Sequence, residues 1–480
     1  MAAQKSRRLP PLSGVLVLVM ASTGLVVIDI TIVALGLPLI SADVADGKSA
    51  ESVVVTYMVA MGALTQAAGS LSDRWGRRSL FLAGIAVFTL ASLAATSAQD
   101  LWWLNAARVF QGCGAAVIMV NGIPLISDRY TGEERNLAIG AWGSFATAAG
   151  LLAPALGGVL IDAVGWRAVF AINLPLGAAA WALAARVLPR PSPAPASAPS
   201  STGRPDWAGS LLLMLGLGTA TLLMLRPDDR PWAGQDTVAL LTACLALAAF
   251  LVLQLRVPMP TLELRMFTRP AFCGAMLAVL LSRVLTIGGS VYLVLYLSDG
   301  LGLNPTAAGL LMTPIFLAQI ATGMVGSKLL SHWAPGLVIG SGYLLKAIGF
   351  AALALLITPN TPWWALLGPL LAWGAGGGIA GAPVMAVAVQ VTEPERVGMV
   401  AGAVSTLASL GAGVGTAALG AVFALHGGAG TGSRAVADGT RAVLTVSAAL
   451  AAVAVLTTLV LIHPHRVPRP DRTRAREPAR

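Results

Sequence analysis

The chain has 480 residues, of which 56% are hydrophobic and only 11% charged, and its mean hydropathy is +0.79. Soluble domains carry about 25% charged residues, so this composition excludes a soluble globular protein. The formal net charge of +10 does not indicate nucleic-acid binding, because the cytoplasmic loops of a membrane protein collect Lys and Arg. Apolar runs of about 20 residues, the length that crosses a ~30 Å hydrocarbon core, recur along the chain. We therefore predict an all-α integral membrane protein.

Gly, Pro and charged clusters divide the apolar stretches into fourteen predicted membrane helices. The first of them is read as a helix that stays in the protein, because it is too long for a signal peptide and contains an internal acid, Asp29. The predicted helices cover residues 13–38, 52–71, 79–97, 101–126, 136–160, 168–188, 207–225, 237–256, 271–297, 305–330, 336–357, 362–389, 397–425 and 441–462.

The distribution of Lys and Arg predicts the orientation in the membrane. If the amino-terminal tail (1–12) is cytoplasmic, most basic residues fall on the cytoplasmic side, as the positive-inside rule requires. An even number of helices then places the Arg-rich tail (463–480) in the cytoplasm as well. The outer segments hold only Lys48, Arg167, Arg226, Arg230, Arg434 and Arg441.

A Pro-rich segment predicts how the chain is divided. Residues 189–206 combine prolines with Ala, Ser and Arg, a composition typical of an extended cytoplasmic linker. This linker follows the sixth predicted helix, at the point where an N-terminal six-helix bundle (13–188) would end. The helices in 207–256 then form an inserted pair, and 257–462 form a C-terminal six-helix bundle. Such a layout of repeats is typical of secondary transporters.

The loop after the second predicted helix reads Gly69-Ser-Leu-Ser-Asp73-Arg74-Trp-Gly76-Arg77-Arg78. Its glycines permit a tight turn, and its basic residues favour the cytoplasmic side. We predict that Asp73 pairs with Arg77 or with a facing helix end when a cytoplasmic gate is shut. The predicted gate residues are Gly69, Asp73, Arg74, Gly76, Arg77 and Arg78.

Two further segments combine small residues with polar or kinking residues inside predicted helices. In Leu104-Asn-Ala-Ala-Arg108-Val-Phe-Gln111-Gly112-Cys-Gly114, the polar Gln111 lies on the same face as Arg108. A buried arginine in a membrane helix needs a partner or a wet cavity. In Gly150-Leu-Leu-Ala153-Pro154-Ala-Leu-Gly157-Gly158, the small residues allow close helix packing and the proline introduces a kink.

These segments resemble the signature motifs of the major facilitator superfamily. The Gly69 loop resembles the signature between its second and third helices, and the segment around Arg108 resembles its second motif. The third segment, with Gly150, Pro154, Gly157 and Gly158, is close to the antiporter motif of exporters, except that Ala153 replaces a glycine. Three more stretches resemble the fourteen-helix drug:proton antiporters: Val27–Pro38, Trp166–Gly177 and Glu395–Gly402 with Gly411–Gly415.

The resemblance implies a major facilitator fold with fourteen transmembrane helices. It also implies an antiporter that exports amphiphilic drugs or antibiotics by alternating access. Such a protein uses the proton gradient and needs no cofactor. The expected partners are the small-molecule substrate, protons and the lipid bilayer of a bacterial cell membrane, and we expect a monomer.

Only four formally charged side chains lie well inside the predicted helices: Asp29, Arg108, Arg283 and Lys346. Burial favours the neutral form of a carboxylic acid and a nearby cation favours the ionised form, so the single acid is the candidate for proton coupling. We predict that Asp29 couples protons and meets cationic substrate, and that Arg108 tunes it. The predicted substrate cavity comprises Asp29, Gln111, Trp142, Phe145, Arg283, Tyr292, Tyr296, Phe316 and Lys346.

Other functions remain as alternatives at this stage. The excess of buried bases over acids also suits neutral, zwitterionic or anionic cargo. The direction of transport cannot be read from residues, so a proton symporter that imports a small organic solute or anion stays open. No nucleophile–base constellation or metal-ligand spacing predicts an enzyme or a metal site. No phosphate-binding loop predicts ATP as the energy source.

Overall fold

The structure is a computed structural model, and it describes residues 13–45, 50–189, 206–224, 233–257, 264–330, 332–390, 397–428 and 432–462. These residues form helices joined by short connections. The predicted tails (1–12 and 463–480) and nearly all of the predicted linker (189–206) lie outside the described residues.

The first group of helices runs from Gly14 to Val187, within the range predicted as the N-terminal bundle. The helix starts follow local chemistry: the Ser13 side chain accepts a hydrogen bond from the Leu16 amide, and Asp100 accepts one from the Trp103 amide. The helices are α1 (Gly14–Val44), α2 (Ser52–Trp75), α3 (Arg77–Thr96), α4 (Leu101–Arg129), α5 (Gly132–Val164), α6 (Ala168–Ala171) and α7 (Asn173–Val187).

The second group begins with α8 and α9, the helices predicted as an inserted pair, and continues through the range predicted as the C-terminal bundle. Proline occupies the first turn of α10, α12 and α13, where its missing N–H costs nothing. The helices are α8 (Trp207–Met224), α9 (Gly234–Gln254), η1 (Leu264–Thr268), α10 (Pro270–Arg283), η2 (Val284–Gly288), α11 (Gly289–Leu295), η3 (Tyr296–Gly300), α12 (Pro305–Leu329), α13 (Pro335–Leu356), η4 (Trp363–Leu366), α14 (Leu367–Gln390), α15 (Val397–Phe423), η6 (Ala424–Gly428) and α16 (Ser433–Leu461).

Twelve spans in the described residues are long and apolar enough to cross a membrane. Within α2 and α8 the described apolar stretches are shorter, Ser52–Thr65 and Trp207–Ala220. Two predicted boundaries were wrong. Helix α1 continues past Pro38 to Val44, and α16 begins at Ser433 instead of residue 441. Proline is tolerated inside membrane helices, and both helices extend into polar end segments that the apolar pattern omits.

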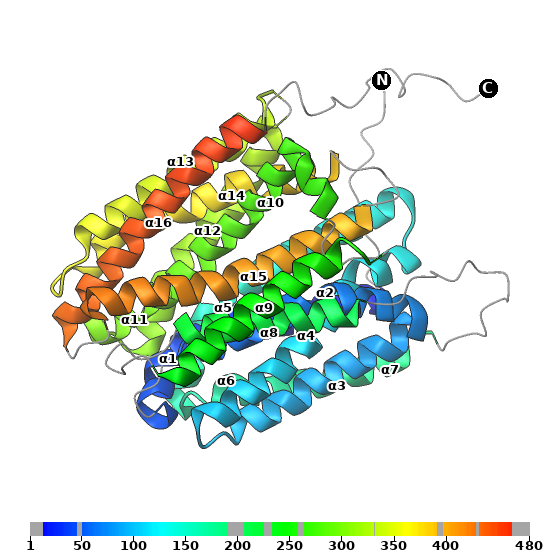
Figure 1. Cartoon of the computed structure of the whole chain (residues 1–480), viewed down its shortest axis with the longest axis horizontal. Helices are drawn as coiled ribbons and strands as arrows, with labels where there is room; N and C mark the ends of the chain where they lie inside the picture. Colours follow the sequence, from blue (N-terminus) through cyan, green and yellow to red (C-terminus); the bar gives the residue numbers. More distant parts are fainter. Residues whose placement is uncertain are drawn as a thin grey trace.

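The helices form two bundles, and Figure 1 shows α10, α12, α13, α14 and α16 grouped apart from α3, α6 and α7. We name the two ends of the molecule by α1: the Gly14 end, where α1 begins, and the Val44 end, where it stops. At the Gly14 end, the position of a Cβ on Gly14 lies 2.9 Å from the Val187 side chain of α7. At the Val44 end, Trp166 donates a hydrogen bond to Asp43 of α1.

The two bundles contact each other through two antiparallel helix pairs. Helices α5 and α12 touch backbone to backbone: a Cβ on Gly158 would lie 2.5 Å from the Pro305 carbonyl oxygen, and one on Gly309 would lie 2.1 Å from that of Pro154. Helices α2 and α15 meet where a Cβ on Gly413 would contact Val59. All these positions belong to the Val44-side part of their helices, so the bundles are packed together at that end.

The predicted inserted pair, α8 and α9, covers the contact between α2 and α15, one of the two seams between the bundles. Leu213 of α8 and Phe250 of α9 are buried in a cluster with Ala63 of α2 and Leu410 of α15. Leu217 of α8 packs against a neighbouring cluster of α2 and α15 side chains. The pair therefore contacts both bundles, as an insertion between them can.

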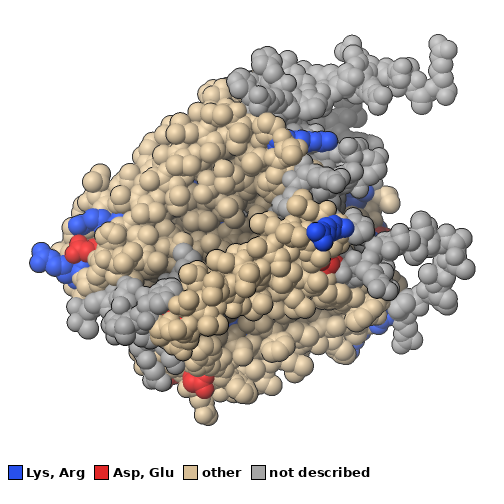
Figure 2. All heavy atoms as spheres, viewed as in Figure 1, with Lys and Arg blue, Asp and Glu red and all other residues tan. Residues whose placement is uncertain are grey.

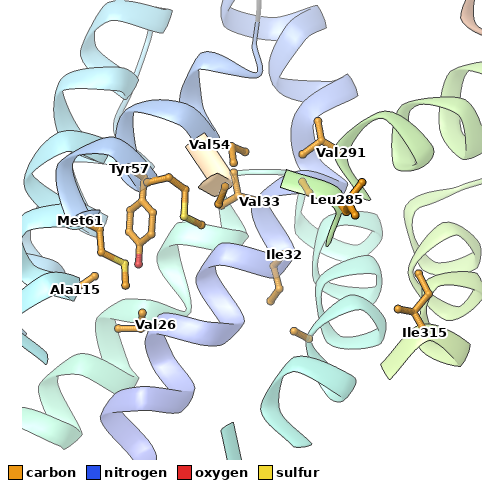
Figure 3. Close-up of a cluster of buried hydrophobic side chains, with 14 of the residues drawn as sticks. Val26, Ile32, Val33, Val54, Tyr57, Met61, Ala115, Leu285, Val291 and Ile315 are labelled. Atoms are coloured by element: carbon orange, nitrogen blue, oxygen red, sulfur yellow. The ribbon is translucent and has the colours of Figure 1, made fainter. Parts of the chain in front are cut away.

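The surface and the core agree with a membrane protein. Figure 2 shows Lys, Arg, Asp and Glu atoms near the two ends of the molecule, with a mostly uncharged surface between them. Inside, large apolar side chains of several helices form one continuous core. Figure 3 shows part of it, with Tyr57 and Met61 of α2, Ala115 of α4 and Val26 of α1 in one cluster.

Candidate functional site

The predicted acid, Asp29, lies near the middle of α1 and is 1% exposed. Both of its carboxylate oxygens are engaged. Oδ2 accepts a hydrogen bond from Nη1 of Arg108 at 2.6 Å, which is also an ion pair. Oδ1 accepts hydrogen bonds from the side-chain amides of Gln111 and Asn173, each at 2.9 Å. The carboxylate is therefore held by three donors from α4 and α7.

Arg108 is fully buried on α4 and contacts α1 and α2 at once. Its Nε donates to the Val53 carbonyl of α2 at 3.0 Å, and its Nη1 also donates to Gln111 Oε1 at 2.7 Å. The guanidinium carbon lies 4.0 Å from the centroid of the Tyr57 ring, within cation–π range. The arginine thus has the partners that a buried cation in a membrane requires.

Ser92 of α3 completes the network. Its hydroxyl accepts hydrogen bonds from Gln111 at 2.8 Å and from Asn173 at 3.3 Å, and donates one to the Phe88 carbonyl at 2.8 Å. Asp29, Arg108, Gln111, Ser92 and Asn173 together join α1, α3, α4 and α7. We call these five residues the Asp29 network.

Sequence reasoning brought Asp29, Arg108 and Gln111 together correctly but gave no role to Asn173 or Ser92. Asn173 stands in the quoted stretch Trp166–Gly177, and a buried polar residue at the start of an apolar helix was the available signal. Ser92 carries no such signal, because serine in an apolar helix commonly bonds to its own backbone.

Two polar atoms beside the network have no hydrogen-bond partner among the described residues: the Oδ1 atom of Asn173 and the hydroxyl of Tyr57. Buried polar groups are normally paired, so unpaired ones in a polar cluster point to a rearrangement or to water entry during function. Asn173 Oδ1 can accept a proton donor after rotation of its amide.

The predicted gate loop lies at the Gly14 end, between α2 and α3. Gly76 adopts φ +85°, a conformation that favours glycine, and this turn reverses the chain between the two helices. Arg77 forms an ion pair with Asp128 at the end of α4, and Arg78 donates to the Ala185 carbonyl of α7 at 2.7 Å. The loop is therefore tied to two helices of its own bundle.

The structure describes only some side chains of the predicted gate loop. The side chains of Asp73 and Arg74 lie outside the described residues, so the predicted pairing of Asp73 stays a prediction. Gly69 packs near α4, where a Cβ would lie 3.3 Å from Val120.

The predicted antiporter motif forms the contact between the two bundles. The Ile32 side chain of α1 packs against Gly157, and a Cβ on Gly157 would lie 2.6 Å from the Ile32 side chain. Gly158 and Pro154 meet the first two turns of α12 through backbone atoms. At the end of α5, Asp162 accepts a hydrogen bond at 3.0 Å from the Thr306 amide in the first turn of α12. The small residues permit the close helix packing that their spacing predicts, and the structure shows that the helices in contact belong to different bundles.

Two of the predicted cavity aromatics, Trp142 and Phe145, lie on α5, and a third, Phe316, lies on α12. Trp142 donates a hydrogen bond to Thr23 of α1 at 2.8 Å. Phe145 is exposed and lies beside Gly24 of α1. Phe316 of α12 reaches across the seam, 3.4 Å from the position of a Cβ on Gly150. The role of these three aromatics in a substrate cavity stays a prediction.

Tyr292 and Tyr296 are placed differently. Both are fully buried in the C-terminal bundle, and their hydroxyls donate to the carbonyls of Thr416 at 2.8 Å and Thr358 at 2.7 Å. Tyr292 also stacks against Phe423, with ring centroids 5.1 Å apart. In this structure both tyrosines pack between helices, and their role in a cavity stays a prediction.

Arg283 and Lys346 are close to each other in the C-terminal bundle. The ammonium of Lys346 donates to the hydroxyls of Ser282 at 3.3 Å and Thr286 at 3.2 Å. Lys346 is 1% exposed, whereas Arg283 is exposed. Arg283 lies next to Ser282 in α10, so the two positive charges are close in the bundle. The sequence predicted neither their proximity nor the hydroxyls around Lys346, because they come from different helices.

The chain is similar to known proteins along most of its length. The family model described as Major Facilitator Superfamily matches residues 19–416 and 275–480. The chain is 30% identical over 415 residues to the drug efflux pump JefA of Mycobacterium tuberculosis, covering 85% of this chain and 80% of that protein. It is 32% identical over 410 residues to the cephamycin export protein CmcT of Amycolatopsis lactamdurans, covering 84% and 83%.

A solved structure of a bacterial homolog to the human lysosomal transporter Spinster is similar in fold. It superimposes with a TM-score of 0.64 at 16% identity, covering 95% of this chain and 98% of that one.

Proposed function

The chain belongs to the Major Facilitator Superfamily, and on that basis we propose that it is a proton-coupled antiporter that exports amphiphilic drugs or antibiotics from the cytoplasm. The observation that carries the proposal is the Asp29 network: one buried acid, ion-paired to one buried base and held by two amides. The names of the relatives, a drug efflux pump and a cephamycin exporter, support the cargo class.

Protonation of Asp29 would disrupt the network in a defined way. An ionised carboxylate accepts all three donors, from Arg108, Gln111 and Asn173. A protonated one carries a hydroxyl that must itself donate, so at least one of these donors loses its acceptor. Asn173 Oδ1 is the available acceptor for the new hydroxyl. Proton uptake would therefore loosen α1 from α4 or α7.

A movement of α1 would change the contact between α5 and α12 that joins the two bundles. The side chain of Ile32, three residues beyond Asp29, fills the space at Gly157 of α5, and α5 contacts α12 through the next residue, Gly158. A change in the position of α1 would thus alter the contact that holds the Val44 end together. Because a ligand shifts a conformational equilibrium only through its differential affinity, a proton bound in one state and cargo bound in the other give antiport.

We further propose the membrane topology predicted from the sequence. In it, α2 and α8 also cross the bilayer, so that fourteen helices span it and both termini are cytoplasmic. The Gly14 end is then cytoplasmic, and the packed Val44 end faces outward. The present conformation would accordingly be inward-facing, ready to accept cargo from the cytoplasm. The protein would act as a monomer.

The test is export of a fluorescent amphiphilic dye from cells that express the chain, with and without a proton uncoupler. Asp29→Asn at equal expression is compared with Asp438→Asn, an exposed acid on α16 that pairs with Arg441. We expect uncoupler-sensitive efflux that Asp29→Asn abolishes and Asp438→Asn retains. Efflux that survives Asp29→Asn would refute the coupling role, and proton-driven uptake would favour the symporter alternative.

A further inference from the structure

The C-terminal bundle contains a pair of cations that the Asp29 network does not use. Lys346 of α13 is buried, and within the described part of the chain its ammonium donates hydrogen bonds to two neutral hydroxyls, those of Ser282 and Thr286. A buried ammonium in a membrane normally pairs with a carboxylate. Among the described residues of the C-terminal bundle, α10 to α16, the acids are Asp299 and Asp438, and neither forms an ion pair with Lys346.

Arg283, the last residue of α10, adds a second positive charge to the same place. Its Cβ packs 3.3 Å from the position of a Cβ on Gly411 of α15, and it stands next to Ser282 and three residues before Thr286, both of which bind the Lys346 ammonium. Arg283 therefore lies among helices of the bundle and yet is exposed. A charged side chain at mid-span faces a water-accessible space in preference to lipid, so this exposure marks an opening between helices.

The depth of the pair excludes a lipid headgroup as the natural counterion. Arg283 lies thirteen residues after Pro270, where α10 begins. At a rise of 1.5 Å per residue, this places it about 20 Å along the helix, near the middle of a ~30 Å hydrocarbon core. An anion that reaches this depth must enter through the space between the helices.

The backbone around the pair is irregular where a ligand would sit. Arg283 is followed directly by a π-helical turn, η2, which also contains Thr286. Such turns are rare and are found frequently at functional sites. On the other side of Lys346, a Cβ on Gly377 would lie 3.7 Å from the ammonium and 3.7 Å from the Gln319 side chain of α12. The absence of a side chain at Gly377 leaves room beside the ammonium.

We propose that Lys346 and Arg283, with Ser282, Thr286 and Gln319, form a binding site for the anionic group of the cargo, a carboxylate, sulfonate or phosphate on an amphiphilic molecule. Two cations repel each other, so a bound anion relieves the repulsion and accepts hydrogen bonds from both. This site rests on the proposed transport function and narrows its cargo to amphiphilic acids and zwitterions. The apolar part of the cargo would lie toward Phe316, Phe145 and Trp142 at the seam.

The inference is tested by binding without a proton gradient, so that it does not depend on coupling. The purified protein in phosphatidylcholine nanodiscs is titrated with fluorescein, an anion, and with rhodamine 6G, a related cation, and fluorescence anisotropy is recorded. Lys346→Gln and Arg283→Gln should each weaken fluorescein binding by about tenfold or more, because each removes a charge-assisted hydrogen bond. Rhodamine 6G binding should change by less than about twofold, since it uses the aromatic contacts.

Two controls make the outcome specific. Arg434→Gln removes an exposed charge at the start of α16, outside the site, and should bind both dyes as the wild type does. Arg283→Lys keeps the charge and should retain most of the fluorescein affinity. Should Lys346→Gln fail to fold, competition in the wild-type protein replaces it: benzoate should displace fluorescein, and benzyl alcohol at the same concentration should not.

Equal fluorescein affinity in the wild type and both Gln variants, or equal losses for the two dyes, would overturn the anion site. Proton-driven efflux of rhodamine 6G without charge-dependent binding of fluorescein would overturn it and leave the proposed function standing. Charge-dependent fluorescein binding without proton-driven efflux would support the site and count against the proposed coupling.

Discussion

Replacing Gly158 with alanine should open the seam between the bundles at the Val44 end. The added Cβ would lie 2.5 Å from the Pro305 carbonyl oxygen and 2.5 Å from the Thr306 Cα, both backbone atoms that cannot rotate away. Ordinary contact needs about 3.4 Å or more, so α5 and α12 would have to separate by about 1 Å. Overpacking of this kind costs about 1–3 kcal/mol.

This cost applies only to the conformation in which the bundles are packed at the Val44 end. A difference of 1–3 kcal/mol shifts a two-state equilibrium by roughly 5- to 150-fold. The Gly158→Ala variant should therefore populate conformations in which the Val44 end is open. The wild type, by contrast, should remain mostly closed there.

The measurement is a distance distribution by electron spin resonance between labels at Val164 of α5 and Leu310 of α12, both exposed. The three native cysteines, Cys113, Cys244 and Cys273, are first replaced by serine. Gly143→Ala is the matched control, because it makes the same change on α5 where a Cβ meets no atom within 4 Å. A longer distance in Gly158→Ala but not in Gly143→Ala is expected. Identical distributions in both variants would refute the steric argument.

Two more predictions concern buried polar pairs. Arg108→Leu should destabilise the protein by about 3–5 kcal/mol, because it leaves Asp29 buried without its cation. In thermal unfolding, the double variant Arg108→Leu with Asp29→Leu should recover much of this loss of stability. A double variant that recovers no stability would contradict the pairing. Gln254→Leu should destabilise the α8–α9 pair by about 1–3 kcal/mol, because the buried Asp206 carboxylate loses the 2.5 Å hydrogen bond from the Gln254 amide. The effect is measured as increased cleavage of the α8–α9 pair by a protease. Gln254→Glu should increase cleavage further, because it places a second carboxylate beside that of Asp206. Unchanged protection of the pair in both variants would refute this prediction.

Much of the fold was predictable from the sequence because membrane helices depend mainly on local composition. Apolar length and charge clusters placed most helices within a few residues of their observed bounds. The misplaced ends of α1 and α16 were those where a helix continues into polar residues such as Asp43 and Arg434, beyond the apolar signal. The π-helical turns η2 and η3 were not predicted either, since they depend on packing against other helices.

The candidate site was predictable in part. Asp29 and Arg108 stand out because an isolated charge in an apolar run is costly, and in the structure they form an ion pair at 2.6 Å. Ser92 and Asn173 join them through three-dimensional proximity, which a single sequence does not contain. The same holds for Lys346 and Ser282, which lie 64 positions apart and share a hydrogen bond.

The position of the inserted pair has a consequence for how lipids meet the transporter. A cleft between two bundles has two long sides that face the bilayer. Through either side, a lipid acyl chain or a hydrophobic cargo could exchange laterally with the membrane. Leu213 and Phe250 close one such side by burying themselves against α2 and α15. Lateral exchange with the membrane at that depth would then be confined to the opposite flank, beside α5 and α12. A protein with this insertion can hold a hydrophobic cargo in a cleft that α8 and α9 close on one side. The contacts of α8 and α9 with α2 and α15 must then rearrange each time the bundles move relative to each other.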